Sequence, residues 1–451
     1  AVACHGRHRH AGALTDMIGR DAGWLGNNVV TTVLLAVLAV GLQVQVTLPV
    51  SEVGLRVSAA DLLLPFLVAL AFVAGRGRPW AAFEWRDKHT WLWLAVLSAW
   101  MAFAVVWGRV TIGTWLGWAV TNKFAGWFVL VGYFSLGGFF AGIIDSERRA
   151  WFLRALLGAA WIIALGAVAA LAAYRFDLLT TEFDNPIAFR VQGLLDNPNA
   201  FGCLMAFLIA LQAPYLARAE LFPRSLHRAG LALMLAAVVL SGSRSAWIAT
   251  AAGLATVYAL KAFDVRETIR AAVAAALVVA LVYFGRDLLN LLLSGLGWND
   301  GIGGLPRYEP AYILRSNPAG FNERLRSALE ALGLWTGHPL LGTGLGGMLA
   351  RELASGTTTV TLVHNSALWL LVETGLIGLA LFAAFFFFCL RGLLRTAGQD
   401  PFGAAATGAF VAMIGASIGI EALYQRHFWF VLGLALALPA AAGRAAPRRT
   451  A

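Results

Sequence analysis

Long apolar runs, separated by shorter polar connections, recur along most of this 451-residue chain. A helix needs roughly 20 apolar residues to cross the hydrocarbon core of a bilayer. By that measure the sequence predicts about twelve transmembrane helices. The predicted spans cover residues 28–48, 57–75, 90–107, 124–144, 150–173, 198–217, 229–241, 245–260, 270–285, 365–390, 404–421 and 427–442. The runs on either side of residues 241–245 are short enough to form either two helices or one broken helix.

Composition supports the membrane class. Hydrophobic residues make up 59% of the chain and charged residues 13%, whereas a soluble domain is nearer to about half apolar. We therefore expect an all-α polytopic integral membrane protein with the lipid bilayer as its main partner. Lys and Arg outnumber Asp and Glu by 34 to 24, but they lie in short runs between apolar segments, so nucleic acid is not an expected partner. The three cysteines are scattered and suggest neither a disulfide framework nor a thiolate metal site.

The basic residues gather before the first predicted span and after each even-numbered one. Because positively charged loops resist translocation, both termini are predicted to be cytoplasmic. Residues 1–27 would form a cytoplasmic N-terminal segment rather than a cleaved signal peptide, and residues 443–451 a cytoplasmic tail. The membrane domain would comprise residues 28–285, with spans one to nine, and residues 364–442, with spans ten to twelve. Residues 286–363 would form a large external loop before the tenth span.

Two external segments, 174–199 and 286–363, are too long to be simple connections, which predicts a functional role for the larger one. Within it, residues 322–333 read as an amphipathic helix along the membrane face, with Leu325, Leu329 and Leu332 on one side. Residues 337–347 form a glycine-rich turn. Its amides could cradle a phosphate, or the turn could simply pack the loop onto the membrane domain. No Lys-Ser/Thr pair follows the glycines, so it is not a P-loop.

Three external arginines are candidate ligands for an anion, because an arginine at the end of an apolar helix is costly to leave without an anionic partner. Arg244 lies between two apolar runs; its alternative role is to cap a helix C-terminus or to reach lipid headgroups. Arg190 precedes an Asn-Pro-Asn turn, and the alternative is a loop arginine paired with Asp184 or Asp196. Arg324 lies on the amphipathic helix, where a solvated face is the ordinary explanation.

His364 stands where the tenth predicted span begins. A neutral imidazole there could act as a general base toward a hydroxyl, with Asn365 orienting either it or a substrate. The alternative is a hydrogen-bonded or helix-capping histidine. His338 is the competing base, although its Gly-His-Pro setting is typical of a turn. The sequence has no Glu-x-x-His pair or cysteine cluster, so we expect neither a metal nor another cofactor.

His364-Asn365, followed after nine residues by Gly375-Leu-Ile-Gly378, resembles the signature of the O-antigen ligase and O-antigen polymerase superfamily. The turn at 339–346 and Ser243-Arg244-Ser245 resemble other landmarks of that family. The resemblance implies a metal-independent, GT-C-like integral-membrane glycosyltransferase of the bacterial inner membrane. Its active site would face the periplasm, and the large external loop would be periplasmic. The donor would be a glycan on undecaprenyl pyrophosphate, and the ligase's acceptor a sugar hydroxyl of lipid A-core oligosaccharide, in lipopolysaccharide biosynthesis.

The candidate residues suit that chemistry. Arg190, Arg244 and Arg324 could neutralise the diphosphate and the charge of the leaving group. His364 would deprotonate the acceptor hydroxyl for a displacement that inverts the anomeric carbon, while Asn365 and His338 would contact substrate. Because pyrophosphate is already an activated leaving group, neither ATP nor a covalent intermediate is required.

Three alternatives remain open at the level of sequence. An O-antigen polymerase would join two lipid-linked glycans, and a protein O-oligosaccharyltransferase would use a Ser or Thr of a protein as acceptor. A transporter of lipid-linked glycan would need charged residues within its spans and internal repeats. Asp61 is the one charge that we expect to be buried, which does not favour transport.

Overall fold

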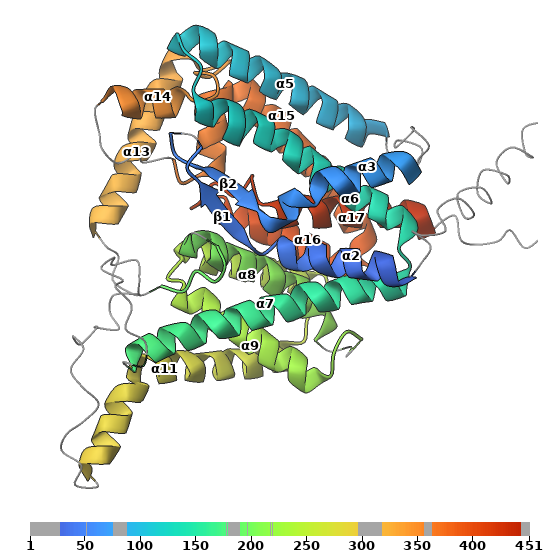
Figure 1. Ribbon diagram of the computed structural model, residues 1–451, viewed down its shortest axis with the longest axis vertical. Coiled ribbons are helices and arrows are strands. Elements are labelled where there is room, and N and C mark those ends of the chain that lie inside the picture. Colours follow the sequence, from blue (N-terminus) through green and yellow to red (C-terminus); the bar gives the residue numbers. More distant parts are fainter. Residues whose placement is uncertain are drawn as a thin grey trace, which may run out of the picture.

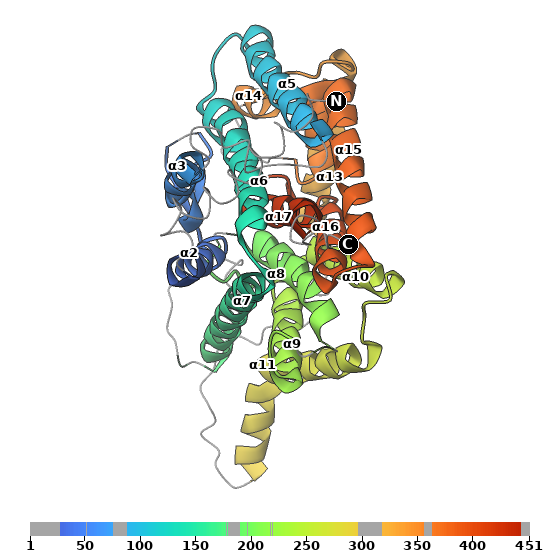
Figure 2. The same ribbon diagram turned by 90° about the vertical axis from the view of Figure 1, so that its right-hand side faces the viewer.

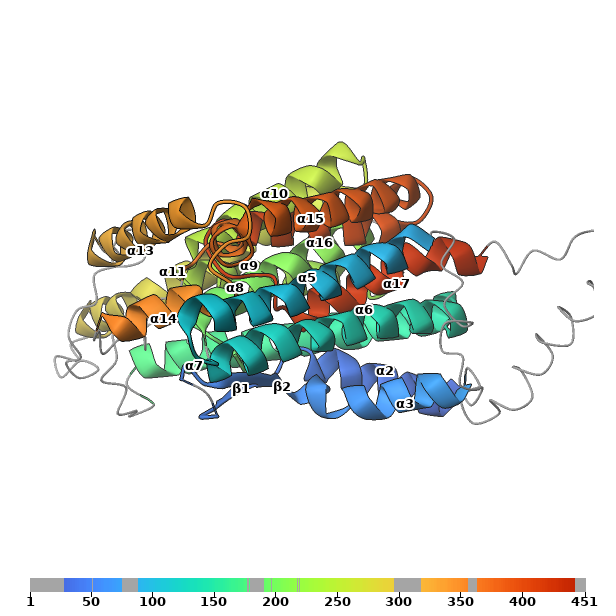
Figure 3. The same cartoon turned by 90° about the horizontal axis from the view of Figure 1, so that it is seen from above.

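The computed structural model describes residues 28–50, 52–74, 88–176, 178, 190–195, 197–216, 218, 220–295, 318–355 and 363–442. Within these residues the chain forms an elongated bundle whose helices run mostly along one common direction (Figures 1 and 3).

Each predicted span contains a helix. These helices are α2 (Asn28–Gly41), α3 (Leu64–Ala74), α5 (Lys88–Ile112), α6 (Gly126–Ile143), α7 (Ser146–Arg175), α8 (Pro198–Gln212), α9 (Arg224–Leu240), α10 (Arg244–Ala259), α11 (Val265–Gly295), α15 (Ser366–Ala397), α16 (Pro401–Ala416) and α17 (Arg426–Ala442). Among the described residues, 5 segments are long and apolar enough to cross a membrane, namely His89–Ile112, Ala119–Gly142, Ser146–Arg175, Val265–Ser294 and Ser366–Ala397. The protein is thus mostly helical with several candidate spans, and the number twelve stays a prediction. The runs around residues 241–245 form two helices.

A small β-hairpin makes the all-α expectation wrong in one place. Strands β1 (Gln45–Leu48) and β2 (Leu55–Ser58) pair antiparallel, and the 3-10 turn η1 (Ala59–Leu62) leads from β2 into α3. Val46, Thr47 and Val57 are β-branched residues, which favour extended backbone over helix. The ends of the first two predicted spans therefore leave the helices, so α2 and α3 have only 14 and 11 residues.

Helix α11 extends past residue 286, where the large loop is predicted to begin. Helix α11 continues to Gly295 because the leucine-rich run after Asp287 contains good helix formers and no proline. The predicted amphipathic helix is also longer, since α13 spans Pro318–Gly337. Its predicted apolar stripe faces outward, with Leu329 61% exposed. A short helix, α14 (Gly347–Ala354), follows the glycine-rich turn.

The centre of the bundle is an aromatic core between α6, α15 and α17. Figure 2 shows α6 and α17 next to each other near the middle of the molecule. Trp127 lies 5.4 Å from Trp429 between ring centroids, and Phe385 stacks on Trp429 at 5.9 Å. Helices α6 and α17 approach closely at Gly137 and Gly433, where an added Cβ would collide with the opposite backbone. A π-helical turn, η2 (Ala119–Ala125), starts α6.

The two ends of the bundle differ. We call the end at which α15 begins the His364 end; the hairpin, α13 and α14 also lie there (Figure 3). The start of α2 and the end of α17 lie at the opposite end (Figures 1 and 3). The arrangement agrees with an even number of crossings between these two points, while the side of the membrane stays a prediction.

Candidate active site

His364 lies immediately before α15, on a turn that is tied to the end of α16. The side-chain oxygen of Asn365 caps α15 by accepting from the Leu368 N–H at 2.9 Å. Its amide nitrogen donates to the carbonyl of Ile418 at 3.1 Å. Both the oxygen and the nitrogen of the Asn365 side chain are therefore bonded to the main chain. These bonds fix the position of the neighbouring, half-buried His364.

The first residue of α15 strengthens this connection. The Ser366 N–H donates to the Ser417 carbonyl at 2.9 Å, and the Ser366 hydroxyl donates to the Ile420 carbonyl at 3.1 Å. The same hydroxyl accepts from the Ala422 N–H at 2.9 Å. Residues 417–422, which we call the α16 turn, thus form a platform beneath the start of α15.

Arg190 is fixed between the end of α9 and the start of α8. Its Nε donates to the Ser241 carbonyl at 2.5 Å, and its Nη2 donates to Oδ1 of Asn199 at 2.6 Å. Asn199 lies in the first turn of α8, which Asn197 caps. Asp184 and Asp196, the alternative partners expected from sequence, lie outside the described residues. The observed contacts leave the guanidinium half-buried and rigidly placed.

Arg244 is the first residue of α10, with Ser243 as its N-cap. The C-terminal capping role considered from sequence is therefore wrong. The side chain is exposed, and no hydrogen bond or ion pair holds it among the described residues. Because the N-terminus of a helix carries partial positive charge, Arg244 adds a full charge where the potential is already positive. The start of α10 is therefore suited to an anion.

The predicted residues come together through the α16 turn. A Cβ placed on Gly242 would lie 3.1 Å from Nε of Arg190, so that arginine contacts the turn leading to Arg244. A Cβ on Gly419 would lie 2.8 Å from Cβ of Ser245, so the α16 turn touches the start of α10. The same α16 turn holds Asn365. Arg190, Arg244 and the turn that carries His364 thus occupy one neighbourhood at the His364 end.

Arg324 approaches from α13. It is half-buried and lies one helical turn from Ser327 and two turns from Ala331, both of which are buried. Ala331 packs in a small core with Met348, Val363 and Val372. Val363 directly precedes His364, so the inward face of α13 reaches the candidate site.

The glycine-rich turn is used for packing, the second of the two roles considered from sequence. The Thr343 N–H donates to the Val372 carbonyl at 2.8 Å, and the Leu345 N–H donates to the Ala104 carbonyl at 2.9 Å. A Cβ on Gly344 would lie 2.1 Å from the Gly108 nitrogen, so only glycine permits this approach to α5. These two amides are therefore not available to a phosphate. His338 is exposed at the start of the turn and lines a pocket together with residues of α5 and α14.

A buried cation lies directly behind the α16 turn, and sequence reasoning missed it. Lys123, in η2, forms an ion pair with Glu421. Its ammonium lies over the rings of Trp118, Trp369 and Tyr424, at 4.4, 4.4 and 4.7 Å from their centroids. We call Lys123 and these three rings the lysine cage. It ties η2 to α15 and to the segment before α17.

Glu373 is a second buried charge that was missed. It is 0% exposed and accepts from Nε1 of Trp369 at 2.9 Å. Asp61, the expected buried charge, pairs with Arg426 at 2.9 Å. An acid inside an apolar span is itself a signal of a built site, and Glu373 lay inside the predicted span 365–390. Among the described residues, no group of three or more His, Cys, Asp and Glu could hold a metal ion.

Comparison with known families adds an independent finding. The family model described as O-antigen ligase matches residues 229–383. This region is similar to O-antigen ligases. The matched region runs from α9 into α15, and it contains every predicted site residue except Arg190. A search of curated proteins finds no match to the chain.

Proposed function

We propose that the protein is an inner-membrane glycosyltransferase that transfers a glycan from undecaprenyl pyrophosphate to a sugar hydroxyl of lipid A-core oligosaccharide, without a metal ion. The observation that carries the proposal is the meeting of Arg190 and Arg244 with the turn that holds His364. Arg244 and His364 both lie within residues 229–383, the region that is similar to O-antigen ligases. In this proposal the His364 end faces the periplasm.

The diphosphate of the donor would lie between the starts of α8 and α10. Arg190 is held at fixed orientation by Ser241 and Asn199, which leaves it preorganised for an anion. Arg244, exposed at the N-terminus of α10, supplies a second charge. Arginine forms strong charge-assisted hydrogen bonds with phosphate oxygens. Arg324 would approach the same group from α13.

His364 would act as the general base. The acceptor hydroxyl gives its proton to the neutral imidazole as its oxygen forms a bond with the anomeric carbon of the donor sugar. The bond between that carbon and the pyrophosphate oxygen breaks, and undecaprenyl pyrophosphate leaves with the electron pair. Attack on the face opposite the leaving group inverts the anomeric configuration. The arginines stabilise the negative charge that develops on the leaving oxygen.

The test is transfer of a labelled glycan from undecaprenyl pyrophosphate to purified lipid A-core, with the full chain in lipid nanodiscs and chelator present. His364→Ala should lower the transfer rate by about 10²–10⁴-fold, the usual contribution of a general base. Arg244→Gln should lower it by about 10–100-fold, since hydrogen bonds to charged groups contribute about 1.5–3 kcal/mol. Arg395→Gln is the matched control, because Arg395 is an exposed arginine in the last turn of α15 at the opposite end.

Three outcomes would contradict the proposal. Transfer that requires an added divalent metal would remove its metal-independent step. Full activity of His364→Ala would remove the base. Elongation of the lipid-linked glycan, with no transfer to lipid A-core, would reassign the protein as a polymerase of the same superfamily.

A further inference from the structure

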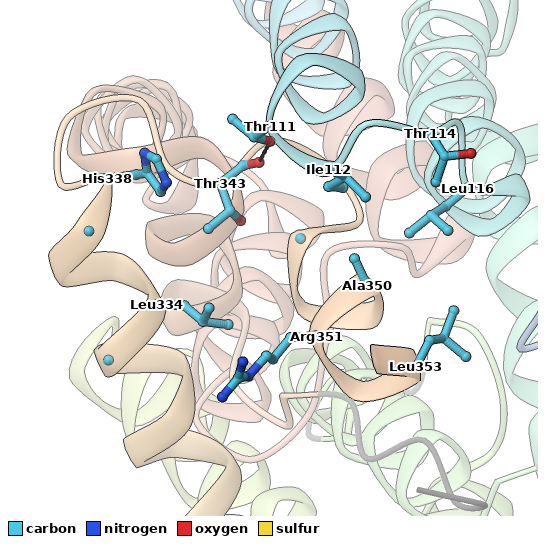
Figure 4. Close-up of a pocket in the computed structure, with 13 residues that line it drawn as sticks. Thr111, Ile112, Thr114, Leu116, Leu334, His338, Thr343, Ala350, Arg351 and Leu353 are labelled. Carbon is cyan, nitrogen blue, oxygen red and sulfur yellow. Dashed lines mark hydrogen bonds between the residues drawn. The ribbon is translucent and has the colours of Figure 1, made fainter. Parts of the chain in front are cut away.

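A cleft lies between the end of α5, the end of α13 and α14 (Figure 4). Its volume is about 650 Å³, within the range of small-molecule sites. Thr111, Thr114, Leu334, His338, Arg351 and Leu353 are among the residues that line it. Ala331 of α13, Met348 of α14 and Val363 pack in one small core, and Val363 directly precedes His364. The lining residues do not include His364, Arg190, Arg244 or Arg324.

The charge of the cleft has one sign. Its lining contains one arginine and one histidine and no acidic residue. Arg351 is exposed and has no ion pair or side-chain hydrogen bond among the described residues. Figure 4 shows its guanidinium extending from α14 toward α13, with His338 at the end of α13. A guanidinium in this position, with no competing acid in the lining, favours an anion with two oxygens, such as a phosphate or a carboxylate.

The rest of the lining suits a sugar. Leu334 and Leu353 offer apolar surface on α13 and α14, against which the C–H face of a pyranose ring can pack. The Thr114 hydroxyl is exposed on the facing side. The floor is rigid, because the Thr111 hydroxyl donates to the Thr343 carbonyl at 2.5 Å and the turn is bonded to α5 and α15. Apolar walls with a few fixed polar groups are typical of preformed ligand sites.

We propose that this cleft is a subsite for an anionic sugar, one that bears a phosphate or carboxylate group, with Arg351 as its main ligand and His338 as a second. The inference rests on the proposed transfer reaction, in which either the acceptor oligosaccharide or the donor glycan carries that sugar. It assigns to His338 a role in substrate recognition and none in the chemistry at the anomeric carbon.

Direct binding tests the subsite without any transfer. The probes are a hexose 6-phosphate, the free hexose and inorganic phosphate. Binding of each probe to the full chain in nanodiscs is measured by ligand-observed NMR. The hexose phosphate should bind at least 10-fold more tightly than either other probe. Arg351→Gln should weaken its binding at least 10-fold, Arg351→Lys should weaken it less, and Arg395→Gln should leave it unchanged. Equal binding by wild type and Arg351→Gln would overturn the proposal, as would equal affinity for inorganic phosphate and hexose phosphate.

Transfer assays then identify the source of the sugar. With phosphorylated lipid A-core and a neutral donor glycan, Arg351→Gln should raise KM for the acceptor about 10-fold with little change in kcat. Dephosphorylated acceptor should abolish that difference. With an acidic donor glycan and dephosphorylated acceptor, a raised KM for the donor would place the anionic sugar on the donor. If neither the KM for the acceptor nor the KM for the donor changes, the subsite proposal is wrong for both substrates.

The two proposals fail separately. If wild type binds hexose phosphate through Arg351 but transfers no glycan to lipid A-core, the subsite stands and the ligase function falls. If transfer requires His364 but neither binding nor KM depends on Arg351, the function stands and the subsite falls.

Discussion

The side-chain amide of Asn365 donates to the carbonyl of Ile418 across 3.1 Å, which joins the start of one helix to the end of another beside the candidate base. Asn365→Ala removes this bond and the N-cap of α15, with an expected cost of about 0.5–2 kcal/mol for the cap. Turnover should also fall, because His364 would lose its fixed position. Asn365→Asp keeps the capping acceptor but loses the donor. Melting temperatures in detergent should therefore rank wild type above Asp and Asp above Ala; an unchanged Ala variant would show that the contact is unimportant.

Arg190 and Asn199 should act as one unit, since they are joined by a 2.6 Å hydrogen bond. Arg190→Lys removes the planar group that reaches both Ser241 and Asn199, so activity should fall even though the charge remains. Asn199→Ala should lower activity by releasing the guanidinium. In a double-mutant cycle on transfer rate, the two effects should be less than additive. Full additivity would mean that Asn199 does not orient Arg190.

Gly375 interrupts α15 with φ of 70° and ψ of −177°, a conformation that is essentially restricted to glycine. A Cβ there would lie 2.1 Å from the Leu340 carbonyl oxygen. Backbone strain alone is expected to cost about 1–3 kcal/mol. Because of the added collision, Gly375→Ala should destabilise the protein by more than that. Gly166→Ala is the matched control. Gly166 lies in α7 with nothing near its Cβ position, so alanine there should be neutral or stabilising by up to about 1 kcal/mol. Thermal unfolding in detergent measures both.

The pair of Lys123 and Glu421 predicts strong non-additivity. Lys123→Met leaves Glu421 without its cation, and Glu421→Gln leaves a 3%-exposed ammonium without its anion. Breaking a buried ion pair from one side typically costs about 3–5 kcal/mol. The double variant should cost less than the sum of the singles. If each single variant melts like wild type, the lysine cage does not stabilise the His364 end.

Glu52 predicts an acid-sensitive contact at the hairpin. Partial burial raises its pKa, but backbone hydrogen bonds from Glu52 itself, Trp118 and Gly117 outweigh burial, so the pKa lies below its ordinary value of 4.5. The carboxylate accepts from Gly117 at 2.8 Å and from Trp118 at 2.7 Å. A lowered folded-state pKa adds stability that is complete above the unfolded pKa and is lost as pH falls through the folded value. Glu52→Gln should therefore lower the melting temperature at pH 7 and have a smaller effect well below pH 4.5. An equal effect at both values would exclude a role for the charge.

Hydrophobic length predicted a helix within each of the twelve apolar runs, and each run contains one. It failed where backbone preference mattered locally. The β-branched residues after Gly41 turned two helix ends into a hairpin, and the leucine run after Asp287 carried α11 past a charged pair. Both signals are present in the sequence, but hydrophobic length alone does not weigh them against the length of the apolar run.

The individual residues of the candidate site could be predicted from the sequence, but their proximity in space could not. His364, Arg190 and Arg244 were identified from the sequence because a charged or titratable group at the end of an apolar run is costly and usually has a function. Their meeting depends on the α16 turn, whose carbonyls at Ser417, Ile418 and Ile420 bind the start of α15. Backbone carbonyls leave no signature in a sequence. The observed partners of Asn365, the Leu368 amide and the Ile418 carbonyl, are likewise main-chain atoms that a sequence does not reveal.

The turn between α13 and α14 has a consequence for how the protein is assembled. Its carbonyls at Pro339 and Leu340 accept from the Leu376 and Ile377 amides, where Gly375 has broken the ladder of α15. Its Leu345 amide is bonded to α5. A helix made early in synthesis and one made late are thus joined by a segment made in between. During biogenesis α15 would enter the bilayer with unsatisfied backbone groups at its break, and these would be satisfied only when the turn docks from outside. The His364 end would then be the last part of the protein to reach its folded arrangement.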